Sequence, residues 1–374
     1  MSLTGTPFFL TSLALLTVAV VLPLALWGRI AGPPPIRVLA RLLMLLFAQV
    51  TAITVVFVLV NNANNLYDTW GDLLGTDSHI QAAQDLGPDG MGGRKIKDEP
   101  KQIQQFRPAD DARMGSGVQM TDLKGRISGV SGEVYVWLPP QYNDPAYRNK
   151  KFPVVELLPG YPGSAKAWYG ALHVGEQLRP LMQRGEIKPF ILVSPRTNIL
   201  TGADTGCVNI PGKVNADSWL TVDVRRMVID NFRAGGKPDS WALAGYSAGA
   251  HCAAKLALSH PDRYRAAVAM SGYNDPALEP DSLAGKDPKL RVESNPLHIL
   301  KSANAAGRPP RTALFVSGAA GDGYQAGIGL QQLAKAPTTV TVQQIAADAG
   351  GHTTAVWRTQ VPEIFRWLGQ RVRA

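Results

Sequence analysis

The sequence is poor in charge and in cysteine for its length: 18% of its 374 residues are charged, and only two are cysteine. It has no run of lysines and arginines interleaved with aromatic residues, so its net charge of +9 does not indicate a nucleic-acid groove. It also lacks a metal-ligand cluster, a phosphate-binding loop and a dinucleotide fingerprint, and we therefore expect no cofactor. A mildly basic surface near an anionic membrane or wall polymer explains the charge more simply.

Charged side chains are missing altogether from residues 1–28. Two apolar runs, Phe8–Trp27 and Leu42–Val60, are each long enough to cross the core of a bilayer, and a proline cluster at 33–35 breaks the chain between them. A cleaved signal peptide would need a basic start and a small-residue cleavage site, which are absent. We expect a transmembrane helical hairpin over residues 1–60; the alternative is a buried hairpin of a soluble protein.

The arginines around these runs predict which side of the membrane the rest of the chain occupies. Arg29, Arg37 and Arg41 lie in or beside the connection, and no lysine or arginine follows Val60 until Arg94. By the positive-inside rule the connection is cytoplasmic, and everything after Val60 lies on the extracytoplasmic side.

Beyond a polar linker at 61–115, whose apolar cluster near Trp70 suits an interfacial helix, a regular pattern fills residues 116–374. Short apolar runs without alternation are typical of strands buried on both faces of a parallel sheet, and helical stretches separate them. We therefore predict one α/β domain with a mainly parallel, doubly wound sheet. Two antiparallel strands are expected at 117–124 and 133–138, buried strands at 153–158, 190–193, 241–244, 266–270, 313–316 and 340–345, and helices at 217–232, 248–259, 324–335 and 354–368.

The motif Gly-Tyr-Ser-Ala-Gly at 245–249 stands directly between a predicted buried strand and an alanine-rich helix. At such a turn the two glycines permit a strained backbone that presents the serine hydroxyl above the edge of the sheet. The string alone occurs easily by chance, but its position between strand and helix is what nucleophilic catalysis requires. Ser247 is therefore the candidate nucleophile.

A serine needs a base to take its proton, and in this arrangement the acid and then the histidine follow it along the chain. His352 comes after two glycines just beyond the last predicted strand, where the loop can bend toward Ser247. We expect His260 and His298 to be helix caps or surface residues. His251, one turn after the serine on the same helix, is expected to be structural.

The candidate acid is Asp322, in a flexible turn after the strand expected at 313–316. Asp275, after the preceding strand, is the competing acid, and capping of the next helix is an alternative role for Asp322. An oxyanion hole needs one N–H from the residue after the serine and one from a loop after an early strand. These requirements give Ala248 and Tyr161, since the neighbouring Pro162 has no N–H.

The two cysteines lie on the side expected to be extracytoplasmic, where a disulfide persists. Cys252 is about one turn past Ser247, and Cys207 is in the loop after the strand expected at 190–193. We predict a disulfide that holds this loop beside the site; two free thiols are the alternative.

Five strings in the last two thirds of the chain are typical of one enzyme family: Gly-Glu-Val-Tyr-Val-Trp-Leu-Pro-Pro from Gly132, Leu-Pro-Gly-Tyr-Pro-Gly from Leu158, Gly-Tyr-Ser-Ala-Gly from Gly245, His-Pro-Asp-Arg-Tyr from His260, and Gly-Gly-His from Gly350. With these strings, residues 130–368 resemble the esterase D and mycolyltransferase-like branch of the α/β-hydrolase superfamily, the putative esterase family, in a membrane-anchored actinobacterial form. The resemblance implies a triad of Ser247, Asp322 and His352, with oxyanion donors at Tyr161 and Ala248.

The mycolyl-transferring members of that family have a glutamate as the acid and an arginine directly after the oxyanion residue, where this chain has Asp322 and Pro162. We therefore expect a serine ester hydrolase that acts through an acyl-enzyme on a lipid- or cell-wall-linked ester outside the membrane. The alternatives are an acyltransferase, and a binding or wall-scaffold protein that keeps the fold without turnover.

Overall fold

The computed structural model describes residues 3–76, 79–80, 83–87, 89–95 and 98–374. Contacts within it divide the chain into two compact units, residues 1–76 and 77–374. The segment predicted as a linker, 61–115, is thus shared between the two units.

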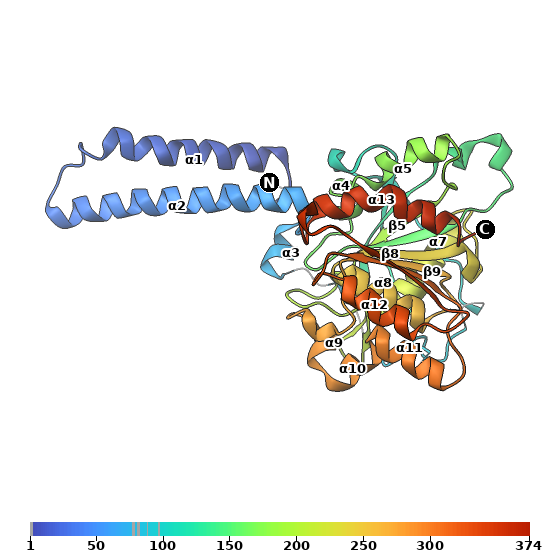
Figure 1. Cartoon of the computed structure of the whole chain (residues 1–374). Helices are drawn as coiled ribbons and strands as arrows, with labels where there is room; N and C mark the ends of the chain where they lie inside the picture. Colours follow the sequence, from blue (N-terminus) through green and yellow to red (C-terminus); the bar gives the residue numbers. More distant parts are fainter. Residues whose placement is uncertain (1–2, 77–78, 81–82, 88, 96–97) are drawn as a thin grey trace. The chain divides into compact units, whose positions relative to one another are not determined.

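The first unit contains two long helices and a short one: α1 (Thr6–Leu26), α2 (Pro34–Asn64) and α3 (Trp70–Leu74). Helices α1 and α2 pack side by side, and both are long and apolar enough to cross a membrane (Figure 1). The second helix begins at Pro34 rather than at Leu42, because proline at the first helical position lacks only an N–H that has no intrahelical acceptor. Arg37 and Arg41 consequently lie in α2, where Arg41 donates to the carbonyl oxygen of Trp27.

In the described part of the second unit, nine strands form one sheet in the order β1-β2-β3-β5-β4-β8-β9-β10-β11. The pairs from β1 to β5 are antiparallel, and every neighbouring pair from β5 to β11 is parallel. The predicted mainly parallel sheet is confirmed. The strands are β1 (Arg107–Pro108), β2 (Val118–Lys124), β3 (Ser131–Trp137), β4 (Val154–Leu158), β5 (Ile191–Pro195), β8 (Trp241–Tyr246), β9 (Ala266–Met270), β10 (Ala313–Gly318) and β11 (Thr339–Gln344), beside a small ribbon of β6 (Asn209–Ile210) and β7 (Val214–Asn215).

Helices cover both faces of this sheet, as Figure 1 shows for α5 and α13 on one side and α8, α11 and α12 on the other. A π-helical stretch at Trp219–Val224 joins α6 to α7. The helices of this unit are α4 (Ala167–Gly170), α5 (Val174–Gln183), α6 (Ala216–Ser218), α7 (Arg225–Asn231), α8 (Ala248–Ser259), α9 (Leu283–Lys286), α10 (Pro288–Glu293), α11 (Pro296–Ala305), α12 (Tyr324–Leu333) and α13 (Thr354–Gly369).

The two faces carry two separate hydrophobic cores, because successive residues of a strand point to opposite sides. In β8, Trp241 and Leu243 belong to the core beneath α8, whereas Ala242 and Ala244 belong to the core beneath α13. All four side chains are fully buried. Strands buried on both faces therefore read as continuous apolar runs, which is why the sequence revealed them.

Part of the segment predicted as a linker packs on the second unit. Strand β1 extends the sheet next to β2. The main-chain N–H groups of Gln102 and Gln104 donate to the side chains of Asp230 and Asn231 on α7, at 2.9 and 2.8 Å. These bonds attach the segment before β1 to helix α7 of the second unit.

Candidate active site

Ser247 occupies a strained turn between the end of β8 and the start of α8. Its φ is 56° and its ψ is −126°, a region that residues with a side chain rarely adopt. The neighbouring glycines are required by close approach: a Cβ on Gly245 would lie 2.0 Å from the Gly249 carbonyl oxygen, and one on Gly249 would lie 2.2 Å from that of Leu158. The motif thus folds into the tight strand-to-helix turn that its glycines predict.

Three side chains from separate loops meet at the carboxyl edge of the parallel strands. His352, between β11 and α13, has its Nε2 2.9 Å from the Ser247 Oγ and its Nδ1 2.8 Å from Asp322 Oδ1. Asp322 lies in the turn between β10 and α12. The structure therefore brings the predicted nucleophile, base and acid into one hydrogen-bonded chain.

Aromatic side chains support the imidazole from the side. The ring of His352 stands edge-on against Trp357 at 4.8 Å, and Trp357 stacks on Tyr246 at 4.4 Å. The indole N–H of Trp357 donates to the Ser271 hydroxyl at 3.0 Å. Because Tyr246 directly precedes the serine, this stack links the orientation of His352 to the turn that carries Ser247.

The predicted oxyanion donors come from two places next to the serine. Ala248 is the first residue of α8, so its N–H belongs to the first helical turn, which has no intrahelical acceptors. The loop after β4 passes close by, because a Cβ on Gly160 would lie only 3.0 Å from the Cβ of Ser247. Tyr161 follows in that loop, and its main chain lies within one residue of this close approach.

The competing acid is engaged elsewhere. Asp275 pairs with Arg291, whose Nε lies 2.8 Å from Oδ1, and it also accepts the N–H of Ala277. The hydrogen bond from Arg291 outweighs the opposing effect of burial and lowers the pKa of Asp275. The structure thus places Asp322, not Asp275, against the imidazole of His352.

The remaining histidines have other surroundings. His251 is buried and its Nδ1 lies 3.0 Å from the Tyr273 carbonyl oxygen, and burial lowers its pKa to about 4, so it is neutral. His298 is exposed on α11. His260 is the C-cap residue of α8, one of the two roles expected for it, and its Nε2 also lies 2.8 Å from a carboxylate oxygen of Asp217 in a largely buried ionic cluster that the sequence did not predict.

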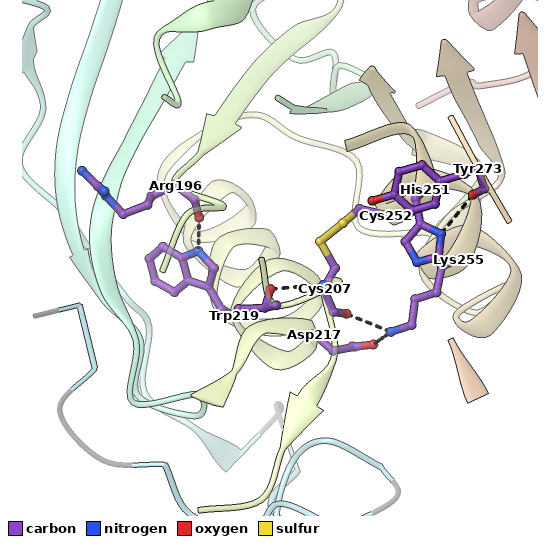
Figure 2. The surroundings of a disulfide bond; sticks show 9 residues. Arg196, Cys207, Asp217, Trp219, His251, Cys252, Lys255 and Tyr273 are labelled. Carbon is purple, nitrogen blue, oxygen red and sulfur yellow. Dashed lines mark hydrogen bonds and ion pairs between the residues drawn. A yellow bond between two sulfur atoms is a disulfide. The ribbon is translucent and has the colours of Figure 1, made fainter. Parts of the chain in front are cut away.

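The predicted disulfide between Cys207 and Cys252 is confirmed, and Figure 2 shows its surroundings. The Nζ of Lys255 lies 2.9 Å from the Cys207 carbonyl oxygen and 2.5 Å from Asp217 Oδ2. Sequence reasoning did not find this second attachment, since neither partner belongs to a motif. The loop that follows β5 is therefore attached to α8 by the disulfide and by the hydrogen bond from Lys255, whose ion pair with Asp217 also joins α8 to α6.

A pocket of about 760 Å³ opens beside the three side chains. No group of residues suited to hold a metal occurs in the described ranges. The pocket is lined by Ser247, Ser271, Gly272, Tyr273, Asn274, Asp275, Leu278, Glu279, Asn295, Leu297, Gly321, Asp322, Gly323, Gln325, Ala326 and His352.

Solved structures of esterases share the architecture of the second unit. A ferulic acid esterase aligns with a TM-score of 0.55 and 20% identity, covering 72% of this chain and 99% of that one. An S-formylglutathione hydrolase from Agrobacterium tumefaciens aligns with a TM-score of 0.53 and 17% identity, covering 72% and 99%. The fluorophosphonate-binding serine hydrolase F of Staphylococcus aureus aligns with a TM-score of 0.54 and 17% identity, covering 67% of this chain and 97% of that one. The fold is that of the α/β hydrolases.

Sequence comparison identifies the family within this fold. Residues 128–368 match the family described as "Putative esterase", and the chain belongs to that family. An uncharacterised protein of Corynebacterium glutamicum is 25% identical over 277 residues, which cover 70% of this chain and 63% of that protein. The chain thus spans under two thirds of this relative. Ester hydrolysis is the activity that the family supports.

Proposed function

We propose that the second unit is a serine carboxylic-ester hydrolase that works through an acyl-enzyme on Ser247. The observation that carries the proposal is the chain of hydrogen bonds from the Ser247 Oγ through His352 to Asp322, at 2.9 and 2.8 Å. Membership of an esterase family supports the same chemistry.

In the proposed reaction, His352 Nε2 takes the proton of the serine hydroxyl while Oγ attacks the ester carbonyl carbon. The N–H groups of Tyr161 and Ala248 bind the oxyanion that forms. The histidine then gives its proton to the leaving alcohol, and a water molecule repeats the cycle in reverse to release the acid and free the serine. Asp322 holds the imidazole in the required tautomer and stabilises its positive charge.

We further propose that α1 and α2 anchor the chain as a multi-pass membrane protein, with the second unit on the extracytoplasmic side. The length and apolarity of both helices support the anchoring, and the positions of Arg29 in the connection and of Arg37 and Arg41 in the first part of α2 support the orientation. A tether raises the effective concentration of esters confined to the same surface. The natural substrate is then an ester of a membrane lipid or of another cell-envelope component.

Labelling of the full chain by a fluorophosphonate tests the proposed nucleophile. The reagent should label wild type, and Ser247→Ala should abolish labelling and lower ester turnover by about three to six orders of magnitude. Ser302→Ala is the matched control, because Ser302 is exposed on α11 and should change neither measurement. Wild-type turnover by Ser247→Ala would refute the assignment. Absence of labelling and turnover in wild type would favour the binding or scaffold alternative.

A further inference from the structure

The pocket beside Ser247 has an uneven distribution of charge. Its lining includes three carboxylates, from Asp275, Glu279 and Asp322. Among its described lining residues there is no lysine or arginine, and His352 is the one basic side chain. A ligand in this pocket therefore meets an excess of negative charge, although the protein as a whole is basic.

Two of the three carboxylates have a cationic or imidazole partner. Asp322 accepts a hydrogen bond from the imidazole of His352. Asp275 is held by the guanidinium group of Arg291 on α10. Glu279 forms no ion pair in the described part of the chain, and its Oε1 accepts the main-chain N–H of Asp281 at 3.3 Å. It therefore supplies the uncompensated charge of the pocket wall.

The carboxyl group of Glu279 is partly withdrawn from water. The residue is half-buried, and burial is the largest cause of a raised pKa, to which repulsion by Asp281 adds. The charges of His352 and Lys286 act in the opposite direction. Glu279 and His352 line the same pocket, so a ligand beside the imidazole also faces this carboxyl group. A charge in this setting acts on a bound group more strongly than it would in bulk water.

The position of the pocket indicates which part of an ester occupies it. Its lining contains His352 and Asp322, whereas residues 159–163, the loop of the proposed oxyanion donor Tyr161, are not among the described lining residues. In the proposed reaction the leaving oxygen receives its proton from His352 Nε2 and must lie on the histidine side of Ser247. The alcohol part of the ester is therefore the part that faces Glu279.

We propose that Glu279 selects the alcohol part of the substrate by charge, so that neutral and positively charged alcohols are accepted and anionic alcohols are rejected. The inference rests on the proposed hydrolysis at Ser247. Glu279 exchanges no proton with the reacting atoms and acts as a specificity determinant. Repulsion between the Glu279 carboxylate and an anionic alcohol, taken as two unit charges about 6 Å apart at an effective dielectric constant of about 40, lowers the affinity for that alcohol by about tenfold, or about 1.4 kcal/mol.

Three butyrate esters test this selection on the full chain in a neutral detergent at low ionic strength. They are the esters of choline, of 3,3-dimethylbutanol, which is its uncharged analogue, and of 4-hydroxybutanoate, which is anionic. We expect kcat/KM to fall in that order, with the anionic ester about tenfold below the neutral one. In Glu279→Gln the ratio of kcat/KM for the neutral ester to that for the anionic ester should fall about tenfold. The kcat/KM for the neutral ester itself should stay within about threefold of wild type. Added salt should reduce the discrimination of wild type.

Asp281→Asn is the matched control, because Asp281 is an exposed carboxylate two residues away that does not line the pocket. It should leave the ratio of neutral to anionic ester within about twofold of wild type. Equal kcat/KM for neutral and anionic esters in wild type, or an unchanged ratio in Glu279→Gln, would overturn the selection by Glu279 and leave the hydrolysis standing. Failure of wild type to hydrolyse the neutral ester would overturn the proposed hydrolysis and this inference with it.

Discussion

Removal of the disulfide between Cys207 and Cys252 is expected to lower the stability of the second unit by about 4 kcal/mol. The bond joins positions 45 residues apart. Closing a loop of that length lowers the entropy of the unfolded chain by about 13 cal/mol/K, which gives about 4 kcal/mol at 25 °C. For residues 77–374, whose unfolding entropy is about 0.6 kcal/mol/K, the corresponding change in Tm is about 6 °C.

The double variant Cys207→Ala, Cys252→Ala is suited to this test. Both side chains are almost fully buried, and serine would leave two hydroxyl groups without hydrogen-bond partners there. Guanidinium unfolding of the full chain in detergent, followed by tryptophan fluorescence, measures the free energy of unfolding with and without dithiothreitol. The reductant should destabilise wild type and leave the double variant unchanged.

A loss below about 1 kcal/mol in the double variant would refute the loop-closure reasoning. It would mean that the ion pair of Lys255 with Asp217, together with its bond to the Cys207 carbonyl oxygen, suffices to hold the loop. Fluorophosphonate labelling at 25 °C should persist in the variant, because the turn at Ser247 is shaped by its own glycines and not by the disulfide.

Three further predictions concern the acid, the buried carboxyl and the topology. Asp322→Asn should leave the fold intact and lower kcat by up to about ten-thousandfold, whereas Asp275→Asn should lower kcat only slightly. If ester assays gave the reverse ranking, Asp275 would be the acid. Burial raises the pKa of Glu156 to about 8, so this group stabilises the fold fully below its unfolded value of about 4.5, and stability falls as pH rises toward 8. Urea titrations should show that slope in wild type and a flatter one in Glu156→Gln. Protease added to intact cells should cleave the second unit and spare the loop between α1 and α2; a protected second unit would contradict the proposed orientation.

The sheet was largely predictable because its buried strands can be recognised from short segments of the sequence. The run of five apolar residues at Ala266–Met270 is strand β9 with the predicted bounds, and α8 also begins and ends as predicted. Every residue of β9, and every residue of α8 except the exposed Ser259, is buried, so composition alone reveals both segments. The start of α2 was not predictable in the same way, because the proline that ends one helix can equally well begin the next.

The site was predictable only as far as chain order and motifs reach. The Gly-x-Ser-x-Gly turn and the glycines before His352 restrict where those two side chains can lie. The sequence favoured Asp322 over Asp275, but the hydrogen bond of Asp322 to His352 and the pairing of Asp275 with Arg291, a surface residue that no motif marks, are visible only in the structure. Glu279 was not singled out from the sequence, because the role proposed for it follows from the shape of a pocket formed by several loops, and loop positions are not encoded in periodicity.

The proposed acyl-enzyme should pass its acyl group to water more readily than to a sugar or lipid alcohol. The side chain of His352 is 47% exposed, so water can reach the base that must activate the second nucleophile. Transfer would require an acceptor held against concentrated water in a site from which solvent is excluded. Moreover, this chain has Pro162 where the mycolyl-transferring members of the family that it resembles have an arginine. Incubation of the full chain with a labelled acyl ester and a series of sugars, glycerol and lipid alcohols measures the partition, with Ser247→Ala as the blank. Free acid should exceed acylated acceptor at every acceptor concentration. An excess of acyl-sugar over free acid would show that the chain is an acyltransferase and not a hydrolase.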